Sequence, residues 1–135
     1  MALPNGGGGV QIGSGNRNET IMSFGAAPQT ATSTATLTAA QVVGGMLLAN
    51  PSTSAATYTL PTAAQIDAAV PNATVGSTFD LSIVNIGTSS GTVTLSMGTG
   101  ITDGGNAAVA VAITSSAVFR FRKTAEGAYT VYKIA

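Results

Sequence analysis

The chain has 135 residues, a length typical of one domain, and only 7% of them are charged, with five cations balancing five anions. It contains no histidine, cysteine or tryptophan. These absences exclude Ser–His–Asp and Cys–His nucleophilic sites, disulfides, and zinc sites built from histidine or cysteine. Zero net charge gives little attraction for nucleic acid. A chain so poor in charge favours association, so we expect an assembly subunit; the alternative is a small monomer kept soluble by its hydroxyl groups.

Residues 1–33 are expected to form an extended, glycine-rich N-terminal arm that precedes the folded domain. Four consecutive glycines, at positions 6–9, resist ordering because glycine loses the most backbone freedom on folding. Burying a few side chains returns less than ordering the arm costs, so the arm needs main-chain pairing with a neighbour. The apolar residues that we expect to anchor it on a partner are Val10, Ile12, Ile21, Met22 and Phe24. The alternative is that they fold back on their own domain.

From residue 34 to residue 135 the sequence has the alternating pattern of a β-domain. Residues 35–38 and 57–60 alternate, and residues 42–48 are apolar around Gly44 and Gly45, which suggests a strand with a bulge. Thr62 is a suitable N-cap, alanines follow it, and Pro71 ends the segment. The sequence therefore predicts one short helix over about residues 62–69.

The second half of the domain continues with short strands and turns. Residues 77–86 and 92–97 alternate on either side of a predicted hairpin loop at 87–91, and a long turn is expected at 98–106. Further strands are expected at 108–113, 117–123 and 129–134, with a tight turn at 125–128. About eight strands with turns every 8–12 residues predict an all-β sandwich or barrel.

One strand concentrates positive charge, in the sequence FRFRK. Alternation places Phe119 and Phe121 in the core and Arg120 and Arg122 side by side outside. Together with Lys123 these arginines are expected to form a basic patch that binds carboxylates on a partner. The alternative is a solubilising outer face.

The acidic residues do not form a catalytic or metal-binding motif. They are scattered over the arm, the helix, a strand and two turns, as Glu19, Asp67, Asp80, Asp103 and Glu126. We therefore expect no enzyme activity, no cofactor and no metal. The chain begins without the charged and apolar regions of a signal peptide, and no apolar stretch approaches the length of a membrane helix, so no membrane partner is expected.

Three segments of residues 36–134 carry a family resemblance. They are TLPTA before the predicted helix, VGSTFDLSIVN after it, and the Phe-Arg-Phe-Arg strand. In this region the chain resembles head decoration, or cement, proteins of tailed bacteriophages and related phage structural β-domains.

The resemblance implies a jelly-roll-like antiparallel sandwich that forms a homotrimer on the capsid exterior. There it would sit between capsomers and stabilise the shell of the major capsid protein, with the arm as its capsid anchor. Similar sandwich domains also occur in phage tail fibres and spikes. The alternative is therefore a tail domain that binds a host-surface glycan, for which Tyr58, Tyr129 and Tyr132 are the plausible stacking residues.

Overall fold

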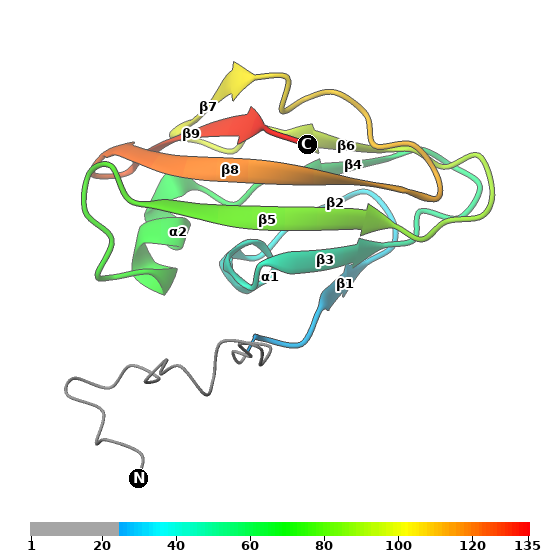
Figure 1. Cartoon of the computed structure of the whole chain (residues 1–135), viewed down its shortest axis with the longest axis horizontal. Helices are drawn as coiled ribbons and strands as arrows, with labels where there is room; N and C mark the ends of the chain where they lie inside the picture. The colour runs from blue at the N-terminus through cyan, green and yellow to red at the C-terminus, as the bar shows by residue number, and fades with distance from the viewer. Residues whose placement is uncertain (1–24) are drawn as a thin grey trace, which may run out of the picture.

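The computed structural model describes residues 25–135, which form two β-sheets that face each other and two short helices (Figure 1). The six-stranded sheet contains β1 (Gln29–Ala31), β3 (Met46–Ala49), β5 (Thr78–Asn85), β7 (Ile101–Gly105), β8 (Ser115–Ala125) and β9 (Ala128–Lys133). The three-stranded sheet contains β2 (Ala35–Thr36), β4 (Ala56–Thr59) and β6 (Val93–Ser96). The helices are α1 (Ala39–Val43) and α2 (Ala63–Ala69).

The first six strands form three coils that stack in parallel. The chain passes from one sheet to the other in every coil, from β1 to β2, from β3 to β4 and from β5 to β6, with a helix between successive coils. Leu47 of β3 consequently lies in register between Gln29 of β1 and Ile83 of β5. The antiparallel hairpin β8–β9 covers the other edge of β5, and β7 adds in parallel to β9.

The expected all-β, jelly-roll-like antiparallel sandwich is wrong, because the protein is a mixed α/β fold. Among residues 25–135, five strand pairs are parallel, including all those within the three-stranded sheet, and only β5–β8 and β8–β9 are antiparallel. Alternation with a period of two reports which side of a strand is buried, and parallel and antiparallel strands share that period. The pattern therefore located most strands but not their partners.

The predicted hairpin at residues 87–91 is also wrong, because β5 and β6 belong to different sheets. The loop between them is a corner built around the buried side chain of Asn85. Its amide donates to the carbonyl oxygens of Gly91 (3.0 Å) and Val111 (3.2 Å), and its carbonyl oxygen accepts from the Gly87 N–H (3.0 Å). At Gly91 a Cβ would stand 2.8 Å from the Ser52 carbonyl oxygen, so this corner requires glycine for close packing.

A helix replaces part of the strand predicted at residues 42–48. Thr38 and Gln41 form a reciprocal capping box at the N-terminus of α1. The chain then turns at Gly45, whose φ is +89°, and β3 begins only at Met46. Helix α2 does lie in the predicted segment, with Thr62 as its N-cap, but it is the second of two helices in the described part of the chain.

The segment predicted as a long turn, residues 98–106, contains strand β7. Its two glycines read as turn residues in the sequence, yet Gly104 packs against a ring: a Cβ there would lie 2.5 Å from Tyr132 Cε1. Residues 108–113, predicted as a strand, make only an isolated antiparallel bridge between Val111 and Val93. The tight turn at 125–128 is confirmed, with Ala125 paired to Ala128.

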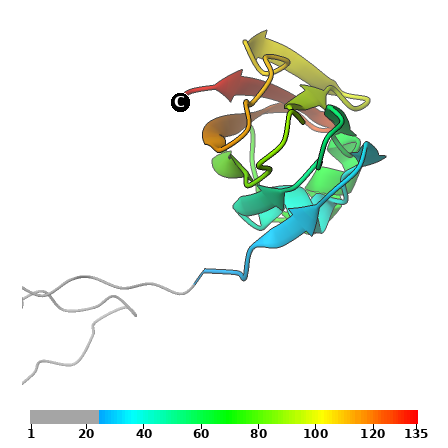
Figure 2. The same ribbon diagram turned by 90° about the vertical axis from the view of Figure 1, so that its right-hand side faces the viewer.

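The core lies between the two sheets, and the helices cover one end of it (Figures 1 and 2). No helix lies in front of β3, β5 and β8 in Figure 1, so the outer face of the six-stranded sheet is uncovered within the described chain. The largest fully buried side chains are Tyr58, Tyr129, Phe119, Phe121, Leu47, Leu60, Ile66, Leu81, Ile83, Leu95, Val42 and Val93.

Replacing the corner residue tests this packing. Asn85→Ala removes three hydrogen bonds and leaves their partners unsatisfied in a buried site, so we expect it to lower the free energy of unfolding by about 2–4 kcal/mol. Urea denaturation followed by circular dichroism measures the change. Thr88→Ala, an exposed change in the same loop, is the control and should alter stability by less than about 0.5 kcal/mol. Equal stability of the two variants would contradict the role of Asn85.

Candidate functional site

The predicted basic patch lies on β8 and divides between two sides of the sheet. Arg120 and Arg122 are exposed on the outer face, as alternation predicted, and Phe119 and Phe121 are fully buried. Lys123 is only 3% exposed. The two arginines therefore share a surface, and Lys123 does not belong to it.

Arg120 is held by a carboxylate on the neighbouring strand. Its Nε and Nη2 donate to the two oxygens of Asp80, at 2.8 and 2.9 Å, in a bidentate pair across β5 and β8. The guanidinium lowers the pKa of Asp80 and keeps it ionised. Both side chains remain nearly half exposed, at 48% and 41%, so the pair contributes little to stability. Arg122 lies between Thr78 and Thr130, which carry no charge.

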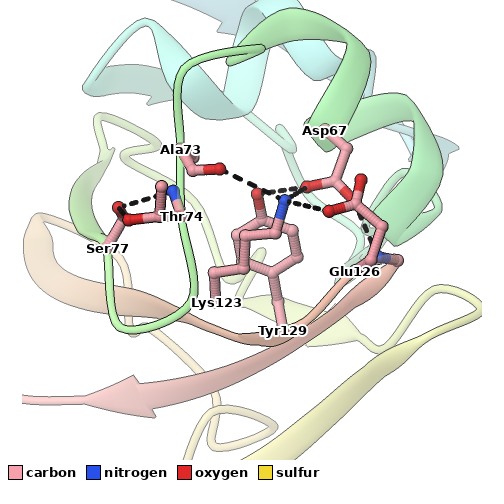
Figure 3. A network of polar contacts seen from close by, with 8 residues as sticks. Asp67, Ala73, Thr74, Ser77, Lys123, Glu126 and Tyr129 are labelled. Atoms are coloured by element: carbon pink, nitrogen blue, oxygen red, sulfur yellow. Dashed lines mark hydrogen bonds and ion pairs between the residues drawn. The ribbon is translucent and has the colours of Figure 1, made fainter.

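Lys123 instead occupies a buried polar network with α2 and the β8–β9 turn (Figure 3). Its Nζ lies 2.8 Å from Asp67 Oδ1, 3.0 Å from Glu126 Oε2 and 3.4 Å from the Ala73 carbonyl oxygen. Asp67 also accepts from the Tyr129 hydroxyl and from the Gly127 N–H, both at 2.7 Å. The network thus ties the helix, the loop after it and the closing hairpin together.

The pKa shifts in this network favour a stable ion pair and not a reactive group. Hydrogen bonds from Lys123, Tyr129 and the Gly127 N–H lower the pKa of Asp67 to about 2, and the same pairing with Asp67 raises the pKa of Lys123. Burial and then the bond to Asp67 raise the pKa of Tyr129 to about 12. At neutral pH the lysine is therefore a protonated ammonium and the aspartate an ionised acceptor. Neither has the poised pKa of a nucleophile or a general base.

Asp103, which sequence analysis placed in a turn, binds the chain itself. Its carboxylate accepts from the backbone N–H groups of Gly105, Ala107 and Ala108 at 2.9–3.2 Å. These bonds lower its pKa, the one to Ala107 contributing most. Within residues 25–135 no three acidic, histidine or cysteine side chains converge on a point where a metal ion could bind.

The three tyrosines considered for glycan stacking do not form an exposed platform. Tyr58 and Tyr129 are 0% and 1% exposed, and Tyr132 is half-buried. Tyr58 directs its hydroxyl to the carbonyl oxygens of Ala31 and Thr32, at 3.0 and 3.1 Å. Aromatic recognition of a sugar needs an accessible ring face, and these two rings are packed in the core.

The five predicted anchoring residues of the arm, Val10, Ile12, Ile21, Met22 and Phe24, lie outside the described residues. The described residues begin at Gly25. Residues 25–28 are all exposed, and Figure 2 shows them leading away from the two sheets.

No protein-family model matches the chain, and comparison with curated proteins and with solved structures found no match. In the part of the chain that is described, neither helix has the length and apolar character needed to cross a membrane.

The Asp67–Lys123 pair generates a prediction about acid stability. The folded pKa of Asp67, about 2, lies below its ordinary value of 3.8. The carboxylate therefore contributes stability that is fully present above about pH 4 and lost as pH falls toward 2. We expect Asp67→Asn to lower Tm at pH 7 by about 5–10 °C and to flatten the dependence of Tm on pH between 4 and 2.

Calorimetry over pH 2–7 measures both effects. Glu126→Gln is the matched control, because its carboxylate contacts the same lysine but is 86% exposed, and it should change Tm by less than about 2 °C. An Asp67→Asn protein with the Tm and the pH profile of the unmodified chain would show that the network contributes nothing to stability.

Proposed function

We propose that the chain is a virion structural protein, a capsid decoration or cement protein that binds the outside of a phage head between capsomers and stabilises the major capsid protein shell. The proposal rests on the resemblance inferred for residues 36–134 from the segments TLPTA, VGSTFDLSIVN and Phe-Arg-Phe-Arg. The jelly-roll fold that the resemblance implied is not part of the proposal, because the structure contradicts it. Two of these segments are adjacent, because VGSTFDLSIVN contains β5, which pairs with the Phe-Arg-Phe-Arg part of β8. The third segment, TLPTA, leads into α2.

The distribution of charge supports a permanent place in an assembly. Asp80 neutralises Arg120, and Asp67 and Glu126 neutralise Lys123. Among residues 25–135, only Arg122 and Lys133 are cations without an ion pair in the described structure. The remaining exposed positions are mostly Thr, Ser, Ala and Gly. A surface with so little net repulsion between copies favours association.

In this function the arm joins the subunit to the shell and the domain associates with copies of itself as a homotrimer. The chain leaves the domain at residues 25–28, which are exposed and point away from it, so the residues before them can reach a second polypeptide. Of the five predicted anchoring residues, Val10 and Ile12 are the farthest from the domain along the chain, and we assign them to the shell contact. Three arms in one trimer would bind with avidity.

Purified protein and phage heads that lack it test the proposal. We expect full-length protein to bind the heads and to raise the temperature at which they lose DNA. Val10→Asp with Ile12→Asp should weaken binding at least about 10-fold, because two buried apolar contacts are lost. Sedimentation of heads with bound protein measures occupancy, and Val75→Asp, a change at an exposed loop residue of the domain, is the control.

Labelling of intact particles separates the proposal from its alternative. Antibody label on the head is expected. Label confined to the tail, together with reproducible hits on a glycan array, would contradict the decoration function and favour a tail domain.

A further inference from the structure

The uncovered outer face of the six-stranded sheet combines an aliphatic strip with the two arginines. In β5, Leu81 and Ile83 are fully buried, so Asp80, Ser82 and Val84 point to the outer face. Register places Leu48 beside Val84, and both Met46 and Val118 beside Ser82. The aliphatic strip, as we define it, comprises Met46, Leu48, Val84, Val118 and Ile134.

The strip is accessible to a partner. Met46 is 40% exposed and Ile134 is 48% exposed, and the three other members are half-buried. Other half-buried apolar residues, such as Phe79 and Met97, pack against the core from within, whereas the strip lies on the opposite side of its sheet. Contiguous apolar surface of this kind is typical of an interaction site.

Charge defines the chemistry of that partner. Beyond the strip, the same face carries Arg120, Arg122 and Asp80, which sum to +1 (two cations and one anion). Arg120 is occupied by Asp80, and Arg122 has no carboxylate partner among the described residues. The complementary surface therefore carries aliphatic or aromatic side chains and one carboxylate next to them.

The sheet edges are less suited to association than this face. At β1 the Gln41 amide already donates to the Thr30 carbonyl oxygen at 2.9 Å. At β6, Val93 exchanges two backbone hydrogen bonds, of 3.0 and 2.7 Å, with Val111. Strand β2 has two residues, and β7 is interrupted by a bulge between Asp103 and Gly105. Short, interrupted and occupied edges resist strand addition.

One segment of this chain outside the described residues has the required chemistry. It is the sequence ETIMSF, residues 19–24, in which Glu19 is the only acidic residue of the first 24 and Ile21, Met22 and Phe24 are apolar. An extended segment spans about 17 Å from Glu19 to Phe24. Val118 and Arg122 are about 13 Å apart along β8. One such segment can therefore contact the strip and Arg122 together.

We propose that residues 19–24 of a second copy bind the outer face of the six-stranded sheet, with the Glu19 carboxylate paired to Arg122 and the apolar side chains on the aliphatic strip. The route of residues 25–28, exposed and directed away from their own sheets, delivers the segment to a neighbour. The inference rests on the proposed function only in that the chain assembles with copies of itself. It divides the arm into a shell contact near Val10 and a subunit contact near Phe24.

Charge reversal tests the pairing in the full-length protein. Arg122→Glu and Glu19→Lys should each weaken self-association about 10-fold, and the double variant should recover to within about 3-fold of the unmodified chain. Sedimentation equilibrium measures the association, and Arg122→Lys, which keeps the charge, is the control. Unchanged association in both single variants, or no recovery in the double variant, would overturn the pairing.

Engineered disulfides test whether the segment binds in trans. The chain has no cysteine, so when Met22→Cys protein is mixed with Val84→Cys protein, no native thiol competes with the two introduced ones. Mass spectrometry separates the heterodimer from the two homodimers. We expect a covalent heterodimer under oxidising conditions, and far less of it when Val75→Cys, on an exposed loop, replaces Val84→Cys. Absence of the heterodimer would overturn the inference. A chain that carries both changes and forms only an intrachain disulfide would overturn it as well.

These tests are independent of the phage head. If the protein passes them but does not bind heads, the proposed function is contradicted and this inference still holds. Removal of residues 1–16 separates the two further, because it should abolish head binding and leave self-association intact. Loss of self-association in that truncated chain would overturn the assignment to residues 19–24.

Discussion

The parallel stacking of three coils is the constraint on which the rest of the structure depends. Because every coil contributes one strand to each sheet, both sheets grow together and bury their inner faces against each other. The β3–β5 register aligns Leu47 with Ile83 in one sheet, and the β4–β6 register aligns Tyr58 with Leu95 in the other, so the core is built in layers along the stack. The hairpin β8–β9 ends the stack, and the ion pair of Lys123 with Asp67 fastens that hairpin to α2. The helices cover an end of the core, which leaves the outer face of the six-stranded sheet without a covering layer (Figure 1).

The same construction explains how a chain with few charges avoids uncontrolled association. Charged residues are the usual protection of sheet edges, and this chain has five cations and five anions in all. Its edges are protected instead by shortness, by a bulge, by the Gln41 amide at β1 and by the Val111 bridge at β6. From the sequence, the arm was expected to pair its main chain with a neighbour, which requires an open sheet edge. In the structure, the surface better suited to association is the outer face of the six-stranded sheet, where an aliphatic strip lies beside Arg122. A face selects its partner by side-chain chemistry, whereas an open edge accepts any extended backbone.

The sequence predicted local features better than spatial partners. The alternation of β5 and β8 correctly placed Phe119 inside and Arg120 outside, and Thr62 correctly marked the start of a helix. Strand pairing was not accessible, because the alternation of a parallel strand is that of an antiparallel one. Helix α1 was not predicted, because the apolar run at residues 42–48 suggested a strand. Thr38 and Gln41 nevertheless have the spacing of a capping box, which was a signal for the helix. The Asp67–Lys123 pair joins residues that are far apart in the chain, so the sequence did not indicate it. Lys123 follows the outward-facing Arg122 by one position, and only this alternation could have shown that Lys123 points inward and does not belong to the basic patch.

The stacked domain thus has a filled core and one sheet face that no other described element covers. We propose that the arm supplies both the anchor on the shell and the cover of that face. The most direct test of this central claim is electron cryomicroscopy of the assembled protein at a resolution that traces the chain from Met1. The account predicts that residues 19–24 of each subunit cross β3, β5 and β8 of a neighbour. A trace in which those residues rest on their own domain, or in which the outer face stays bare in the assembly, would contradict it.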